Sequence, residues 1–279
     1  MKSKKNIINL KKFTIFSLFI FYLFLGLKIV DNYSVSFDEE SNRLYGLVNG
    51  NYILKTFLSD EKYNSLFDKI TSEQFSEKIR IKQPTPLHDF PDKAYGVIFE
   101  LPITAIEIIL NFKNDFDVYV FRHLMTFLFF YFSMIIFYIF MIKIFKNRFI
   151  AILGPILLIS NPRIFADSFY NSKDIVFLSF FLITSYFAYS YSKKKKIKNF
   201  ILLAFFSACS INLRSIAIVI PMMVYIDLIL ASYQNKIFKK ELIFLPVLSL
   251  FFLYFIWPLL WENPIQGLFH VFYWFKELP

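Results

Sequence analysis

Long apolar runs separated by clusters of lysine constrain the fold of this 279-residue chain more than any other feature. A helix needs about 20 mainly apolar residues to cross a bilayer, where every backbone polar group must bond internally. Hydrophobic residues make up 57% of the chain, which exceeds the usual about 45–50% of soluble domains. We predict an all-α polytopic membrane protein with about seven transmembrane helices: Phe13–Val30, Val118–Ile142, Phe149–Ser160 and a little beyond, Ile175–Tyr191, Phe200–Leu213, Ile216–Ala231 and Leu242–Leu260.

The lysine clusters predict the orientation, because Lys and Arg accumulate in short cytoplasmic loops. They precede the first run and follow the second, fourth and sixth, which places the N-terminus in the cytoplasm and the C-terminus outside. We expect a multi-pass protein of a bacterial inner (plasma) membrane. Orientation accounts for the net charge of +10, and nucleic acid is not a predicted partner. The clusters are Lys2, Lys4, Lys5, Lys11 and Lys12; Lys143, Lys146 and Arg148; Lys193–Lys196 and Lys198; and Lys236, Lys239 and Lys240.

A long polar segment follows the first run. Residues 33–117 are predicted to form the first outer loop of a single transmembrane domain, residues 1–279, with no soluble domain. The loop begins with a helix from Glu39 to about Leu58, continues through a charged part, Ser59–Lys82, and then meets several prolines that break regular structure. We expect its helices to lie beside the membrane rather than across it.

Residues 97–112 are apolar but do not fit as a span. As a span they would place Lys143 and its neighbours outside, against the charge rule. They also contain Glu100 and Glu107, which fall on one face of a helix because they are seven residues apart. The segment is therefore predicted to be an interfacial helix on the outer surface, and residues 161–174 a second outer loop.

An acidic stretch, Val35–Tyr45, opens the outer loop and carries Asp38, Glu39 and Glu40 in succession. A charge in the bilayer core costs at least ~2.5–3.5 kcal/mol, so these carboxylates cannot face lipid. They must lie in water or in a polar cavity at the membrane surface.

The predicted topology gathers carboxylates, histidines and arginines on the outer face, while the inner loops hold almost only lysine. Arginine and lysine at membrane depth can bind a lipid-linked phosphate, and a nearby carboxylate can act as a general base. These features suggest group transfer from a phospholipid-like donor. The residues of this face are Asp38, Glu39, Glu40, Arg43, His88, Asp89, Lys93, Tyr95, Arg122, His123, Arg163, Asn171, Lys173, Asp174, Arg214, Trp261 and Glu262.

Each of these residues also has a structural interpretation. Asp38 and Glu39 can simply begin a helix. The pair of residues 122 and 123 can anchor a span at the interface, residues 163 and 173 can contact lipid headgroups, and residues 88 and 89 can belong to an ordinary loop. Arg214 lies between apolar residues and needs either an internal carboxylate or a bound anion.

Metal chemistry is only weakly indicated. Cys209 is the single cysteine and lies in an apolar run, which excludes a disulfide framework and a cysteine metal cluster. A divalent metal held by carboxylates with help from histidine is left open, and no other cofactor is predicted.

The order of these motifs resembles the N-terminal module of the GT-C glycosyltransferases, which include the family-39-like protein O-mannosyltransferases and the lipid A aminoarabinose transferase. In that module one span is followed by an acidic pair opening a juxtamembrane helix, and an outer loop then returns through a second interfacial helix. The similar stretches are Phe37-Asp38-Glu39 with Arg43 and Tyr45, His88-Asp89-Phe90 through Tyr95-Gly96, Phe121-Arg122-His123-Leu124, Asn161-Pro162-Arg163 through Lys173-Asp174, and Trp257-Pro258 through Asn263-Pro264.

The resemblance implies an inverting transfer of sugar from a polyprenyl-phosphate-linked donor to a lipid, glycan or protein acceptor on the outer face. It assigns Asp38 as the catalytic base, with Glu39 supporting it or helping to hold a metal. The implied phosphate-binding candidates are Lys93, Arg122, Arg163, Lys173 and Arg214. Residues in supporting roles are Arg43, His88, Asp89, Tyr95, His123, Asn171 and Asp174.

The chain also departs from these relatives. The Lys-Pro-Pro element of the aminoarabinose transferase is absent, and Pro91-Asp92-Lys93 is a loose stand-in. Relatives usually have more spans and often a soluble C-terminal domain, so this chain is expected to be a truncated product or a fragment. The alternative is a non-catalytic protein, either a transporter of lipid-linked sugars or an inactive homologue. A transporter is expected to place ionisable residues along a path through the membrane. Transport is disfavoured because the predicted spans are nearly free of such residues, with Asp227 as the main exception.

Overall fold

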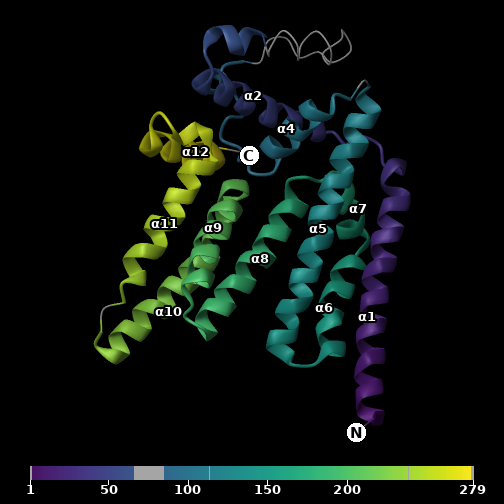
Figure 1. Cartoon of the computed structure of the whole chain (residues 1–279). Coiled ribbons are helices and arrows are strands. Elements are labelled where there is room, and N and C mark those ends of the chain that lie inside the picture. Colours follow the sequence, from purple (N-terminus) through teal and green to yellow (C-terminus); the bar gives the residue numbers. More distant parts are fainter. Residues whose placement is uncertain (1, 66–84, 113, 238, 278–279) are drawn as a thin grey trace.

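The computed structural model describes residues 2–65, 85–112, 114–237 and 239–277, and this part of the chain forms helices without a strand (Figure 1). The all-α membrane fold predicted from the sequence is confirmed. The α-helices are α1 (Lys2–Ile29), α2 (Glu39–Phe57), α4 (Glu100–Leu110), α5 (Asp115–Phe145), α6 (Arg148–Ile159), α7 (Pro162–Tyr170), α8 (Asp174–Lys193), α9 (Ile197–Leu213), α10 (Val219–Asn235), α11 (Glu241–Ile256) and α12 (Pro264–Glu277). Short 3₁₀ helices are η1 (Val30–Asn32), η2 (Leu87–Asp89), η3 (Ser215–Ile218) and η4 (Pro258–Leu260).

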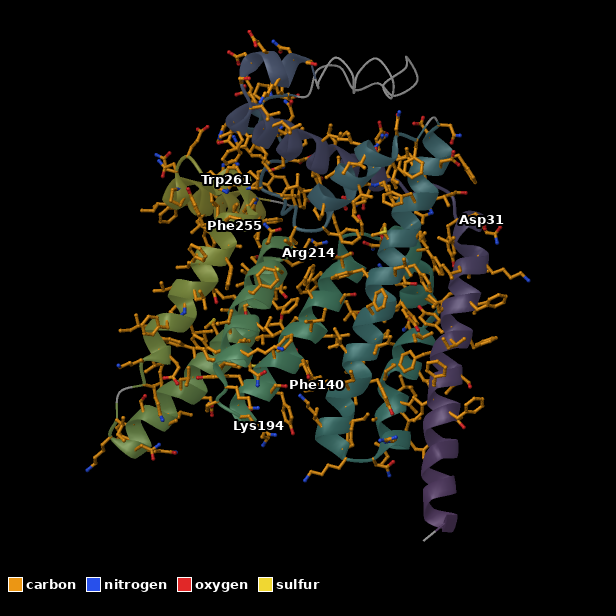
Figure 2. All side chains as sticks on the ribbon, viewed as in Figure 1. Asp31, Phe140, Lys194, Arg214, Phe255 and Trp261 are labelled. Atoms are coloured by element: carbon orange, nitrogen blue, oxygen red, sulfur yellow. The ribbon has the colours of Figure 1, made fainter. Side chains whose placement is uncertain are left out.

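The helices form a bundle with a layer across one end. Figure 1 shows α2 and α4 lying over the ends of α5, α8 and α9, while the N-terminus and the turns after α5, α8 and α10 lie at the opposite end. Figure 2 accordingly labels Lys194 near the lower end and Arg214 near the upper end. The lysine clusters after α5, α8 and α10 and the acidic stretch at the start of α2 therefore occupy opposite ends of the bundle, as the topology predicted.

Four helical segments are long and apolar enough to cross a membrane: Phe13–Asn32, Asp115–Phe145, Asp174–Lys193 and Ser215–Asn235. Helices α6 and α7 add a fifth if they are taken as one span with a 70° bend. The other two predicted spans correspond to the shorter apolar helices α9 and α11. By length alone, the described residues support four or five spans, so the total of seven stays a prediction.

The segment predicted as a second outer loop contains helix α7. The side chain of Asn161 accepts hydrogen bonds from the backbone N–H groups of Arg163 and Ile164, at 3.0 and 3.2 Å, and Pro162 occupies the first turn. These are the standard features of a helix start, because the first N–H groups of a helix need outside acceptors and proline has none to lose. The segment is therefore a regular helix over residues 162–170, and its place outside the membrane stays a prediction.

The predicted helix from Glu39 to about Leu58 is confirmed as α2, which ends at Phe57. Most of the charged part, Ser59–Lys82, lies outside the described residues. Helix α4 has 11 residues and is too short to cross a bilayer, as expected. Its two glutamates share one face, but Glu100 is only 3% exposed and Glu107 only 2%. Their spacing therefore reflects a contact with protein rather than a surface in water.

Two glycines permit close packing of the layer that α2, α4 and residues 85–99 form across the end of the bundle. We call this layer the outer layer. A Cβ added at Gly46 of α2 would lie 2.1 Å from the hydroxyl of Thr104 and 2.8 Å from the carbonyl oxygen of Glu100, both on α4. A Cβ at Gly96 would lie 1.7 Å from the backbone oxygen of Asn212 at the end of α9. The side chain of Asn212 also accepts a 3.0 Å hydrogen bond from the N–H of Ile98. These contacts hold α2 on α4 and fasten residues 94–98 to the bundle.

Glycine 46 provides a test of this packing. We expect Gly46→Ala to destabilise the protein by ~1–3 kcal/mol, because its methyl group overpacks the contact between α2 and α4. The matched control is Gly50→Ala on the same helix, where the nearest atom to the new Cβ is 3.6 Å away. There, alanine should leave stability unchanged or raise it slightly. Thermal unfolding of the purified proteins in detergent measures both effects, and equal stability of the two variants would contradict the packing.

Candidate functional site

The acidic pair at the start of α2 points in two directions. Glu39 is only 3% exposed, and its carboxylate accepts from the backbone N–H of Ser36 at 2.6 Å and lies 2.7 Å from Nε2 of His123. Asp38 is exposed at the N-cap position, yet its side chain makes no capping hydrogen bond. The structural interpretation of the pair thus applies to Glu39, while the carboxylate of Asp38 remains available to solvent and ligand.

Lys173, in the turn before α8, packs on two tyrosines and lies within electrostatic range of Asp38. Its Nζ lies 3.4 Å from the hydroxyl of Tyr45 and 4.0 Å from the ring centre of Tyr95, and these two rings stack with centres 5.0 Å apart. Burial lowers the pKa of Lys173 below that of an ordinary lysine, the charge of Asp38 opposes this shift, and the charge of Arg214 adds to it. The amine is therefore held on an aromatic surface, within electrostatic range of a carboxylate and of a second cation.

Arg214 at the end of α9 has the internal partner that the sequence required. Its guanidinium donates to the carboxylate of Asp174 at 2.7 Å, and the side chain of Asn171 accepts from the N–H of Asp174 at 2.9 Å. Arg214 remains partly exposed, so its other donors can reach a ligand. We call this group the Asp38 cluster; it comprises Asp38, Tyr45, Tyr95, Lys173, Asp174 and Arg214.

Beneath the Asp38 cluster lies a second group of charges that is almost wholly buried. Glu107 accepts from Nε of Arg43 at 2.8 Å and from Arg122 at 2.9 Å, and Arg122 also pairs with Glu100. The hydroxyl of Ser172 donates to Glu100, and its oxygen accepts from Asn42 at 3.1 Å. We call this group the buried ion network; it comprises Asn42, Arg43, Glu100, Glu107, Arg122 and Ser172.

The buried ion network joins four parts of the chain: α2, α4, α5 and the turn before α8. Removal of one partner from a buried ion pair leaves an uncompensated charge and typically costs ~3–5 kcal/mol. The network also adjoins Asp38 and Lys173 through their neighbours in the chain. Ser172 precedes Lys173, and Glu39, beside Asp38, bonds to the helix that carries Arg122.

The remaining predicted residues are distributed elsewhere. Arg163 is exposed on α7 and pairs only loosely with Asp167 at 3.6 Å. Lys93 donates to the backbone oxygen of His88, whose ring lies 3.1 Å from Glu262, and Asp89 is exposed beside it. Of the five phosphate-binding candidates, the structure brings Lys173 and Arg214 together with Asp38, while Arg122 lies in the buried ion network. No group of three or more His, Cys, Asp or Glu side chains in the described ranges is suited to hold a metal.

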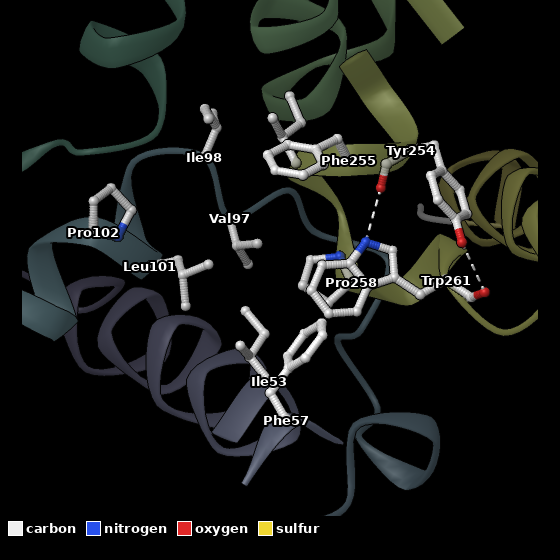
Figure 3. A pocket seen from close by; sticks show the side chains of 11 residues that line it. Ile53, Phe57, Val97, Ile98, Leu101, Pro102, Tyr254, Phe255, Pro258 and Trp261 are labelled. Atoms are coloured by element: carbon white, nitrogen blue, oxygen red, sulfur yellow. Dashed lines mark hydrogen bonds between the residues drawn. The ribbon is translucent and has the colours of Figure 1, made fainter. Parts of the chain in front are cut away.

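An apolar pocket of about 570 Å³ lies at the same end of the molecule as α2 and α4 (Figure 3). It lies between α2, α4 and the end of α11, and the loop that carries Tyr95 supplies part of its wall through Val97 and Ile98. Figure 3 shows the side chains of Phe57, Leu101 and Phe255 around the opening and the hydrogen bond from the Trp261 indole to the Tyr254 carbonyl. The further lining residues are Ile53, Pro102, Ile256 and Pro258.

Sequence reasoning missed the pocket and the roles of Glu100, Glu107 and Ser172. The signal for the glutamates was present, because two carboxylates on one face of an apolar helix need cationic partners. Arg43 and Arg122 were the available cations, but only the folded chain shows that they pair with Glu107.

The model of the dolichyl-phosphate-mannose-protein mannosyltransferase family matches residues 103–261, more than half of the chain. The chain belongs to this family. The resemblance drawn from the sequence motifs is thereby confirmed, and the family identifies a membrane glycosyltransferase of the GT-C kind. No curated protein and no solved structure matches the chain. The family match includes Arg122, Lys173 and Arg214 but begins after Asp38 and Glu39.

The buried ion network yields a stability prediction. We expect Glu107→Gln to destabilise this family member by ~3–5 kcal/mol, because it leaves two buried arginines without their shared carboxylate. The control is Asp167→Asn, which removes the partner of the exposed Arg163 and should cost no more than ~1 kcal/mol. Thermal unfolding of both proteins in detergent measures the difference. Similar unfolding temperatures would show that the network does not hold the layer together.

Proposed function

We propose that the chain transfers a sugar from a polyprenyl-phosphate-linked donor to a hydroxyl or amine acceptor on the outer face of the membrane, with inversion. The observation that carries this proposal is the exposed carboxylate of Asp38 beside Lys173 and Arg214. The family supports a lipid-linked sugar donor and a lipid or protein acceptor. The lysine clusters at the opposite end of the bundle support an outer location for the site.

In this mechanism Asp38 is the general base. It accepts the proton of the acceptor as the acceptor oxygen or nitrogen bonds to the anomeric carbon. The bond from that carbon to the phosphate oxygen breaks, and the electron pair leaves with the polyprenyl phosphate. Lys173 and Arg214 stabilise the negative charge that develops on the phosphate. Attack from the face opposite the phosphate inverts the anomeric centre.

The buried side chains act by positioning. Glu39 fixes the turn that presents Asp38 through Ser36 and His123. Arg122 holds Glu100, which accepts from Ser172 and so places the following Lys173. A base and a cation held at a fixed separation lower the entropic cost of reaching the transition state. We assign Arg122 to this positioning role rather than to phosphate contact.

The apolar pocket fits the isoprenoid chain of the donor. It lies between the outer layer and α11, it is lined mainly by aliphatic and aromatic side chains, and it adjoins the loop of Tyr95. Its volume of about 570 Å³ lies within the about 300–1,000 Å³ usual for ligand pockets, which is enough for part of such a chain.

Substitution of the base tests the reaction. We expect Asp38→Asn to lower transfer from a labelled polyprenyl-phosphate sugar by about 10²–10⁴-fold, because the amide cannot accept the proton. Glu40→Gln is the matched control, since Glu40 is an exposed carboxylate in the same helical turn. Both proteins should keep the unfolding temperature of the wild type. Transfer by Asp38→Asn at the wild-type rate would exclude Asp38 as the base, and a retained anomeric configuration in the product would exclude inversion.

The lowered pKa of Lys173 predicts a pH dependence. Because burial favours the neutral amine, transfer should decline on the alkaline side at a lower pH than an ordinary lysine would set. Lys173→Arg keeps its charge throughout this range, so its decline should begin at higher pH. Initial rates measured from neutral to alkaline pH with varied donor concentration test this. An identical alkaline decline in both proteins would contradict phosphate binding by Lys173.

A further inference from the structure

An apolar groove, separate from the pocket described above, lies at the opposite end of the bundle from the Asp38 cluster. It runs between α9 and α11 and has a volume of about 790 Å³. Its walls are apolar side chains of these two helices: Phe200, Ile201, Phe244, Val247, Leu248 and Phe251. Phe244, Val247 and Phe251 are each more than half exposed, so the wall is open to the surroundings rather than sealed within the protein.

The end of this groove is polar. Lys195 and Lys240 line it together with Tyr191 and Glu241. The hydroxyl of Tyr191 donates to Glu241 at 3.2 Å, and Nζ of Lys195 lies 4.6 Å from the centre of the Tyr191 ring. The phenol and the carboxylate therefore satisfy each other, and the two ammonium groups remain on the rim.

The charge balance at this rim is positive. Lys195 has one carboxylate neighbour, Asp227, at the long distance of 3.7 Å. Lys240 is exposed, and no ion pair involving it is found within the described residues. Further exposed lysines lie at positions 194 and 196 in the turn between α8 and α9 and at position 198 in the first turn of α9. An anion at the rim is therefore attracted by several cations and repelled by two carboxylates that already have partners.

We propose that this groove binds an anionic phospholipid. Helices α9 and α11 are two of the spans predicted from the sequence, so the apolar surface between them would face hydrocarbon. An acyl chain fills such a surface without exposing apolar atoms to water. The phosphate then lies at the end of the groove between Lys195 and Lys240. Basic pockets between transmembrane helices select lipid headgroups in this way, at about 1 kcal/mol for each lysine near the surface. This site is independent of the sugar-transfer site in position and in residues.

Removal of the two rim cations tests the headgroup contact. The purified protein in detergent is incubated with equal amounts of phosphatidylglycerol and phosphatidylcholine, and bound lipid is counted by native mass spectrometry. We expect the wild type to retain phosphatidylglycerol. The double variant Lys195→Gln/Lys240→Gln should retain at least about tenfold less of this lipid than the wild type. The control Lys55→Gln/Lys146→Gln removes the same charge from exposed lysines that do not line the groove and should retain the wild-type amount.

A groove-filling variant tests the acyl-chain contact separately. Val247 is 56% exposed on the wall, so Val247→Trp fills the groove without disturbing buried packing and should reduce lipid retention while both lysines stay in place. An unchanged unfolding temperature and elution volume show that the variant is folded. Equal retention of the two lipids by the wild type, equal losses in the two lysine double variants, or full retention by Val247→Trp would each overturn the proposal.

Discussion

The two ion pairs made by the carboxylate of Glu107 are the interactions on which the layer of α2 and α4 depends. This carboxylate accepts from Arg43 of α2 and Arg122 of α5, so one side chain of α4 ties a juxtamembrane helix to a membrane-spanning one. Charges of this kind are costly to bury and are tolerated only when paired. Here the pairing is close to complete, because Glu100, Ser172 and Asn42 continue the chain of hydrogen bonds. The layer is consequently held by directional bonds as well as by apolar packing.

The sequence predicts the fold well because its signals are strong and local. Apolar runs and lysine clusters indicate spans and sides, and a helix beginning at Glu39 follows from its pattern. Helix α7 was missed although Asn161 and Pro162 are a recognisable helix start. The three residues of the proposed site, Asp38, Lys173 and Arg214, are all candidates from the sequence, and their roles stay predictions. The sequence could not separate them from Arg122 and Arg163, because an arginine that binds a ligand and one that pairs with a buried glutamate look alike until the partner is known.

A single pattern connects the buried ion network with the Asp38 cluster. In two pairs of consecutive residues, one side chain is buried and the other lies in the Asp38 cluster. Glu39 is buried and Asp38 is exposed; Ser172 is buried and Lys173 is half-buried against Tyr45 and Tyr95. In the proposed mechanism, the separation of base and cation is thus set by backbone geometry anchored in the protein interior. Buried neighbours that are fixed by hydrogen bonds hold reactive side chains within the small range of positions that catalysis requires.

The contact between Gly96 and Asn212 has a consequence for how the site can open. The loop that bears Tyr95 touches the end of α9 so closely that no side chain fits between them, and the bond from Ile98 to Asn212 secures it. Together with the buried ion network, this contact ties the layer of α2 and α4 to the bundle at separate points. The layer therefore cannot lift evenly off the bundle without breaking both sets of contacts.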